Sequence, residues 1–244
     1  MRFARRLFVV TAIALLAPQI VVQARADQFV EVPLVDSTTN TSLYNRNFSQ
    51  DLNANPPVTL GTESVPFYYG TSGVQCYDGS HTSYNAFTFA TSISNPDVAY
   101  LLLNTNWGSL GNQAGTVQFN FSNGQSYTLA LISGENIRDW NNDGYANTIR
   151  APYVEQGVFT TSDDDAGVQG RIDMLDVNLS AYSNDTLTGI TFTDDGSDGT
   201  SRLLVGGVTV SETSETATPE PSSLLLLGSG LTALVGLLRK RIAN

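Results

Sequence analysis

The stretch Gly115–Ile132, GTVQFNFSNGQSYTLALI, decides the fold class. Apolar and polar residues alternate in its first seven positions, which places on one face of a strand Val117, Phe119 and Phe121. The segment Ser122–Gln125 then carries an Asn-Gly pair, a hairpin signal. Alternation resumes after the turn and aligns Tyr127, Leu129 and Leu131. The stretch therefore predicts two antiparallel strands that bury one face each.

Six further runs have strand character and are separated by turns rich in Gly, Asn and Asp: residues 28–35, 85–90, 98–104, 171–179, 187–193 and 202–210. Pro33 predicts an edge position for the first run, because proline cannot donate to a ladder. The run 98–104 is apolar on both faces, as expected of a central strand. The alternation of 171–179 slips at Met174, which predicts a bulge. Eight or nine strands of this kind predict an all-β, antiparallel β-sandwich, with a jelly roll as the expected topology.

Both ends of the chain look like targeting segments that flank this domain. Residues 1–26 have a basic start, a short apolar run and an Ala-Arg-Ala site, which predicts a helical signal peptide cleaved before Asp27. A retained membrane anchor is the alternative. The expected domains are the signal peptide at 1–26, the sandwich at 27–210, a linker at 211–218 and a sorting segment at 219–244, with a transmembrane helix at 222–238.

The C-terminal tail has three parts in a fixed order. A Pro-Glu-Pro motif precedes an apolar run, and a basic cluster follows it; the residues are Pro219, Glu220, Pro221, Arg239, Lys240 and Arg241. This order resembles the PEP-CTERM sorting signal of Gram-negative, biofilm-forming bacteria. The resemblance implies that an exosortase in the inner membrane recognises the tail and that the chain reaches the cell surface or the extracellular matrix. A single-span tail anchor is the alternative.

The charge between the two targeting segments is strongly negative. Residues 27–221 contain five arginines against all 23 acidic residues, a formal charge of −18. Such a domain repels phosphate backbones, so nucleic acid is excluded as an expected partner. An acidic surface suits divalent cations and neutral sugars, and it equally suits simple solubility outside the cell.

The segments VAYLLLNTNWG, SGENIRDW, IDMLDVNLS and LTGITFTDDG occur in an order similar to that of galactose-binding-like jelly rolls. The resemblance implies a non-catalytic module that binds carbohydrate with the loops at one end of the sandwich, often beside a structural calcium ion. It transfers architecture only, since no binding motif of that family matches residue by residue.

Two tryptophans with amide neighbours are the candidate sugar platforms. An indole ring can stack on the apolar face of a pyranose while amides bond its hydroxyls, and the candidates are Trp107, Asn104, Asn106 and Trp140. Either tryptophan could instead plug an end of the sandwich, with its N–H bonded to a carbonyl group.

The stretch RDWNNDGYANTIR, residues 138–150, matches the opening of a calcium loop. Its candidate oxygen ligands are Asp139, Asn141 and Asp143. Arg150 occupies the position of the bidentate carboxylate, so a ligand from another loop would have to complete the site. The same residues are also typical of an ordinary turn, and the two interpretations stay open.

No catalytic motif is present, and the expectation is that the protein is not an enzyme. We expect an exported protein that binds exopolysaccharide, with exosortase and the inner membrane as partners during export. The alternatives are a structural matrix protein without a ligand site and a glycan-active hydrolase.

Overall fold

The computed structural model describes residues 28–33, 58–67, 77–78, 85–141, 145–160, 170–194 and 201–213. These segments all belong to one compact unit, Asp27–Ala217. The predicted signal peptide, the sorting tail and Asp143 lie outside the described residues.

The described chain is built almost wholly of strands. In chain order they are β1 (Gln28–Glu31), β2 (Val58–Leu60), β3 (Val65–Phe67), β4 (Tyr77–Asp78), β5 (Asn85–Ser94), β6 (Pro96–Asn106), β7 (Gln113–Phe121), β8 (Ser126–Ile132), β9 (Val154–Thr160), β10 (Arg171–Asn178), β11 (Thr186–Asp194) and β12 (Arg202–Glu212). A short 3₁₀ helix, η1 (Ser180–Tyr182), precedes β11.

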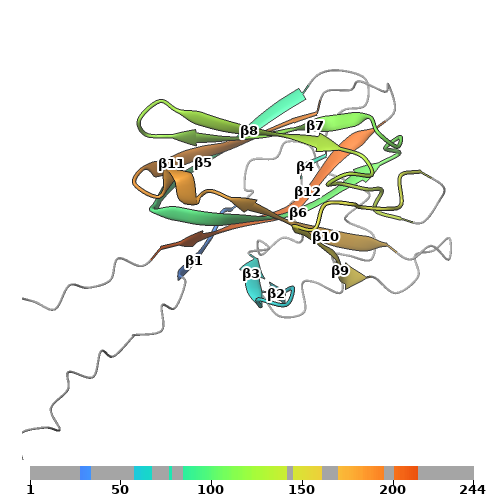
Figure 1. Ribbon diagram of the computed structural model, residues 1–244, viewed down its shortest axis with the longest axis horizontal. Coiled ribbons are helices and arrows are strands. Elements are labelled where there is room, and N and C mark those ends of the chain that lie inside the picture. Colours follow the sequence, from blue (N-terminus) through green and yellow to red (C-terminus); the bar gives the residue numbers. More distant parts are fainter. Residues whose placement is uncertain are drawn as a thin grey trace, which may run out of the picture. The chain divides into compact units, whose positions relative to one another are not determined.

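Ten of the twelve described strands form two antiparallel sheets, which Figure 1 shows one above the other, and β2 and β3 form a separate two-stranded hairpin. The larger sheet has the order β1-β12-β6-β10-β9, and β4 also pairs with β12. The smaller sheet has the order β5-β11-β7-β8. Consecutive strands repeatedly cross from one sheet to the other, so most neighbours within these two sheets are distant in sequence, with β7–β8 and β9–β10 as the exceptions. The all-β, antiparallel prediction is confirmed.

The main core lies between the two sheets. Residues of β6, β10 and β12 face residues of β5, β7 and β11 in one cluster that includes Leu101, Leu175, Val208, Phe89, Phe119 and Phe192. The alternation predicted for β7 is confirmed, because Val117, Phe119 and Phe121 are buried while the intervening polar residues are partly exposed. Burial of this apolar surface is the main stabilising term of the fold.

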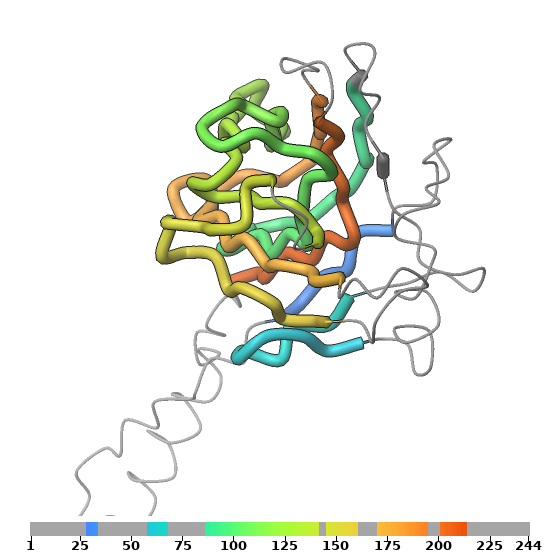
Figure 2. The backbone as a smooth tube through the Cα atoms, turned by 90° about the vertical axis from the view of Figure 1, so that its right-hand side faces the viewer, coloured from blue at the N-terminus to red at the C-terminus, as the bar shows by residue number. Residues whose placement is uncertain are grey.

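The outer face of the larger sheet is covered as well. The hairpin β2–β3 packs there with Phe67 and Val65 against Tyr100, Leu102, Met174 and Leu204. Figure 2 shows this hairpin in cyan beside β1 and β9. The approach is close: a Cβ atom at Gly207 of β12 would lie 2.8 Å from the Phe67 ring. Both faces of the larger sheet therefore make apolar contacts, and the centre of β6 is apolar on both: Leu101 and Leu103 lie in the main core, whereas Tyr100 and Leu102 lie in the outer cluster.

The eight predicted strands are all present, and the sheet topology confirms the predicted edge strand, the predicted central strand and the predicted bulge. The strand β1, which precedes Pro33, is an edge strand, β6 is central, and the register shifts between Ile172 and Met174. Gly124 takes the left-handed backbone of the predicted turn, with φ of 83°. The strands β2, β3, β4 and β9 were not predicted, and β12 continues beyond the expected domain end at Val210 to Glu212.

Candidate functional site at one end of the sandwich

One end of the sandwich gathers most of the predicted site residues. There β6 ends at Asn106, opposite the first residue of β12, Arg202. The connection after β8 returns to this end, where the backbone of Asp139 forms a bridge with Thr105 and Ala146 N donates to Gly108 O at 2.9 Å. We call the segments 105–112, 137–141 and 145–148 the rim.

Trp107 holds an unusual backbone conformation at the centre of the rim. Its φ is +64°, a left-handed value that a bulky side chain rarely adopts and that costs about 1–3 kcal/mol. The carboxylate of Asp139 fixes this turn, because its Oδ2 accepts the Trp107 N–H at 2.6 Å while its Oδ1 accepts the Asn141 N–H at 3.0 Å. Asp139 is fully buried. A buried charge-assisted pair of hydrogen bonds therefore maintains the strained turn.

The indole ring of Trp107 is partly exposed, and Arg202 lies over it. The guanidinium carbon is 5.3 Å from the ring centroid, within the range of a cation–π interaction. Leu110 and Tyr145, on the two loops that flank Trp107, are exposed to 63% and 43%. Large apolar side chains are otherwise rarely exposed in the described chain, so this end offers the contact surface expected of a ligand-binding rim.

The other three predicted sugar contacts are buried within the end of the sandwich. Trp140 donates its indole N–H to Asn106 Oδ1 at 3.1 Å and packs in the outer cluster against Tyr100. Asn104 lies deeper, where its amide donates to Asp173 at 3.0 Å and its carbonyl accepts the Asp173 N–H at 3.3 Å. The structure thus brings all four residues to one end, but only Trp107 reaches the surface.

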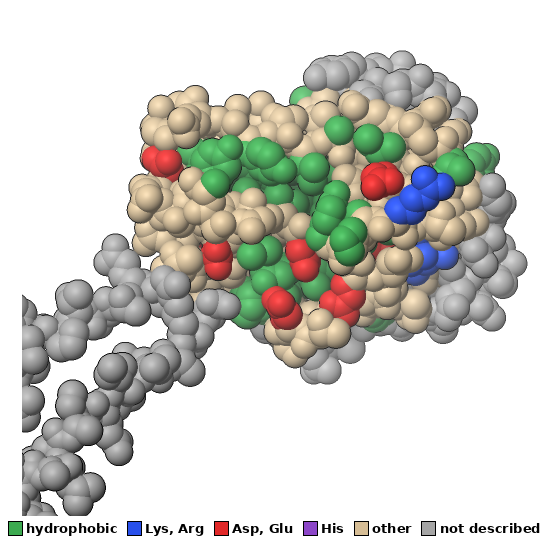
Figure 3. Space-filling view, viewed as in Figure 1, with side chains coloured by type: hydrophobic (Ala, Val, Ile, Leu, Met, Phe, Trp, Pro, Cys, Tyr) green, Lys and Arg blue, Asp and Glu red, His purple; other side chains and the backbone are tan. Residues whose placement is uncertain are grey.

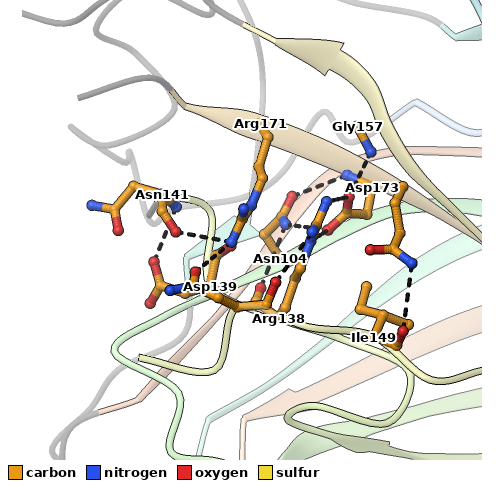
Figure 4. A network of polar contacts seen from close by, with 10 residues as sticks. Asn104, Arg138, Asp139, Asn141, Ile149, Gly157, Arg171 and Asp173 are labelled. Atoms are coloured by element: carbon orange, nitrogen blue, oxygen red, sulfur yellow. Dashed lines mark hydrogen bonds and ion pairs between the residues drawn. The ribbon is translucent and has the colours of Figure 1, made fainter. Parts of the chain in front are cut away.

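An ion pair of Arg138 and Asp173 connects the rim to the larger sheet. Two guanidinium nitrogens of Arg138 donate to the two carboxylate oxygens at 2.7 and 2.6 Å. Gly157 N of β9 adds a third donor at 2.7 Å, and the amide of Asn104 is the fourth. Figure 4 shows these groups converging on Asp173. Because every carboxylate oxygen is hydrogen-bonded twice, the buried charge is well compensated, and β6, β9, β10 and the rim are held together.

The predicted calcium loop is organised around a different cation. The guanidinium of Arg171, at the start of β10, donates to the backbone oxygens of Asp139 and Asn141 at 3.2 and 3.0 Å, and to Asn147 Oδ1 at 2.5 Å (Figure 4). These residues are the first, third and ninth of the matched loop. The Asp139 carboxylate, for its part, is already used by two N–H groups. Among the described residues, no three His, Cys, Asp or Glu side chains are grouped to hold a metal ion. Calcium at this loop stays a prediction that would require Arg171 to move aside.

A second polar cluster lies away from the rim, under the turn of the β2–β3 hairpin. Glu155 of β9 accepts the Thr62 N–H at 3.0 Å, and Tyr100 donates its hydroxyl to Glu63 at 2.6 Å. Asp176 of β10 lies near both glutamates. Burial, followed by repulsion from Glu63 and Glu155, raises the pKa of Asp176 to about 6.

Several residues at the rim were not predicted from the sequence. Arg171 and Arg202 are 24 or more residues away from the residues that they contact, and no local pattern links them. For Leu110 and Tyr145 the sequence does contain a weak indication of exposure. Each is a large apolar residue inside a loop rich in Gly and Asn, and loops of this kind run over the surface.

Among curated proteins, no match to the chain was found. Residues 217–241 match the model of the PEP-CTERM protein-sorting motif, which includes the Pro-Glu-Pro residues and the basic cluster. No helix among the described residues is long and apolar enough to cross a membrane, and the matched tail lies outside them. The motif implies export and processing by an exosortase. The chain is therefore an all-β protein that carries a PEP-CTERM sorting motif at its C-terminal end.

Proposed function

We propose that this exported protein reaches the cell surface or the extracellular matrix and there binds exopolysaccharide through the rim, without cleaving it. The strained and partly exposed Trp107 carries the proposal. A left-handed backbone at a tryptophan is maintained only where surrounding groups enforce it, and such strain is typical of ligand sites. The Asp139 carboxylate supplies that enforcement.

The chemistry of the rim supports a sugar ligand. Aromatic rings stack on the apolar faces of pyranoses, and Trp107 and Tyr145 present rings at neighbouring loops. Arg202 lies over the Trp107 ring, so its guanidinium is placed to donate hydrogen bonds to the hydroxyls of a sugar at this ring. The strand order β1-β12-β6-β10 opposite β5-β11-β7-β8 is compatible with a jelly roll, and this supports the proposed relationship to carbohydrate-binding modules.

A polysaccharide array probed with the full-length chain in detergent tests this function. We expect binding to at least one neutral or acidic polysaccharide, and a loss of affinity of about 10-fold or more in Trp107→Ala, because stacking and the turn are both removed. Tyr145→Ala should weaken binding less. Tyr153→Ala is the matched control, since Tyr153 is exposed to the same 43% but precedes β9, away from Trp107.

The array is run with calcium and with a chelator, which separates a calcium-dependent site from one that relies on Arg171. Absence of signal on every polysaccharide under both conditions would contradict the proposed function and favour a purely structural role. Release of shorter glycans from a bound polysaccharide would contradict the non-catalytic part.

A further inference from the structure

The strand β8 forms one edge of the smaller sheet, and its outward backbone groups are defined by its contacts. Gln125 O accepts the Phe121 N–H from β7, and Ser133 exchanges hydrogen bonds with the segment before β7. Because backbone groups alternate sides along a strand, the odd-numbered residues of β8 bond to β7 and the even-numbered ones point outward. Three outward groups are already paired: the side-chain amide of Asn136 donates to Ala130 O at 2.9 Å and accepts from Ile132 N at 2.8 Å, and Ile132 O accepts the Glu135 N–H at 3.0 Å.

The rest of this edge offers unpaired strand groups, namely both backbone groups of Ser126 and Thr128 and the N–H of Ala130; within the described residues, they have no protein partner. Asn136 shows that the edge accepts strand-like hydrogen bonds. The strand itself contains no proline and no charged residue, which are the usual features that protect an edge from pairing.

The distribution of charged residues also distinguishes the β8 edge from the rest of the domain. Residues 98–134 contain no Asp, Glu, Lys or Arg, although the interval 27–221 carries a formal charge of −18. In Figure 3 the part of the surface along β8 is hydrophobic or neutral, and most acidic side chains lie below it. Two copies of so acidic a domain repel each other, and repulsion is weakest where both present neutral surface.

The other edges are protected. The strand β9 carries Glu155 and a register shift, and β1 has four residues followed by Pro33. On β5, the opposite edge of the smaller sheet, the Ser94 N–H is bound by the carboxylate of Glu212 at 3.1 Å, which places a charge beside that edge.

We propose that β8 pairs antiparallel with β8 of a second copy of this chain, about a two-fold axis at Thr128. Thr128 then faces Thr128 of the partner, and Ser126 faces Ala130. About four new hydrogen bonds form from groups that are unpaired in the single chain. Tyr127 and Leu129, both only partly buried, meet across the axis on the inner face and extend the core. The pairing joins two four-stranded sheets into one continuous sheet, which is a self-complementary interface.

Sedimentation of the full-length chain in density-matched detergent, over a range of concentrations, tests this pairing. We expect a monomer–dimer equilibrium. Thr128→Pro should abolish the dimer, because it removes an N–H that the fold does not use, and Thr128→Lys should weaken it about 10-fold or more by placing a charge on the axis. Thr188→Lys is the control, since it adds the same charge at an exposed position of the inner strand β11.

Hydrogen exchange gives an independent measure of the same contact. The amide protons of Thr128 and Ala130 should exchange more slowly as the concentration rises, whereas that of Leu129, already bonded to β7, should not change. Circular dichroism verifies the fold of each variant. If Thr128→Pro does not fold, Thr128→Lys alone tests whether the dimer depends on Thr128. A monomer at all concentrations, or a dimer that persists in folded Thr128 variants, would overturn the proposal. Trp107→Ala should leave the dimer intact, so failure of the sugar site and failure of this interface are distinguishable.

Discussion

At the residue scale, the side chain of Arg171 joins three residues of the sequence-matched loop. Its guanidinium donates to two backbone carbonyls and to the Asn147 amide oxygen. Planar geometry with several N–H groups makes arginine suited to bridge oxygens in this way. The loop is thus ordered by a cation from the start of β10.

We expect Arg171→Ala to lower the free energy of unfolding by about 2–4 kcal/mol, because several partly buried hydrogen bonds from a charged donor are lost. Urea unfolding measures the change. Arg150→Ala, which removes an exposed arginine from the same loop, should change stability by less than about 0.5 kcal/mol. Equal effects of the two substitutions would show that Arg171 has no special role.

The roles of individual site residues could be predicted only in part, because the same sequence pattern fits two different structural roles. Asparagine beside tryptophan has the same pattern whether the amide bonds a sugar or bonds a buried indole, as Asn106 bonds Trp140. The plugging alternative given for Trp140 matches its burial, whereas the partial exposure of Trp107 depends on a turn whose stabilising carboxylate is 32 residues away.

At the element scale, the β2–β3 hairpin is held to the larger sheet by both apolar packing and a group of acidic side chains. Phe67 and Val65 provide the apolar contact, and Glu155 caps the turn at Thr62. The nearby Asp176 is the unfavourable member of this group, because it is partly buried next to Glu63 and Glu155 and, among the described residues, its Oδ1 has no hydrogen-bond partner.

The raised pKa of Asp176 has a defined consequence for the pH dependence of stability. Between the unfolded value of 3.8 and the folded value of about 6, the native state binds more protons than the unfolded state, so the free energy of unfolding falls as pH rises. The fall from this group is at most about 3 kcal/mol, and about 1–2 kcal/mol after solvent screening. Chemical unfolding at pH 4.5 and 7 should show that Asp176→Asn flattens this fall. Asp185→Asn, before β11, should keep the wild-type profile, and an unchanged profile in Asp176→Asn would refute the assignment.

The elements that the sequence predicted are those with clear alternation or two apolar faces, such as β7, β8 and β6. The missed strands lack both signals. The strands β2 and β3 have only three residues each and include Pro66, and β9 contains Gly157 with a left-handed backbone. Their positions depend on long-range packing on the outer face of the larger sheet, which local periodicity does not encode.

At the scale of the whole molecule, the sorting motif and the site of the proposed binding lie in separate parts of the chain. The described β domain contains the rim and the β8 edge, and the PEP-CTERM match begins after β12, at residue 217. Interactions of the domain are therefore expected to persist in any form of the protein that keeps residues 28–213.

Replacing Pro219, Glu220 and Pro221 together with alanine should abolish processing of the tail in a host that has an exosortase. We expect the unprocessed chain to accumulate in the membrane fraction, because the apolar segment and the basic cluster remain. Mass spectrometry of the fractionated protein measures this. Ser214→Ala with Glu215→Ala, outside the matched residues, is the control, and normal processing of the triple variant would contradict recognition through this motif.

The position of β12 has a mechanical consequence. This eleven-residue strand spans the domain, about 35 Å, from Arg202 at the rim to Glu212, just ahead of the segment that leads into the tail. It is an inner strand, paired with β6 on one side and with β1 and β4 on the other. When a polymer held at the rim is pulled against a tail fixed to the cell, tension runs along the strand axis. It loads the ladders on both sides in shear, and many hydrogen bonds must then fail together instead of one at a time. A domain whose two points of load are connected by one central strand is suited to resist unfolding by the tension that fluid flow produces.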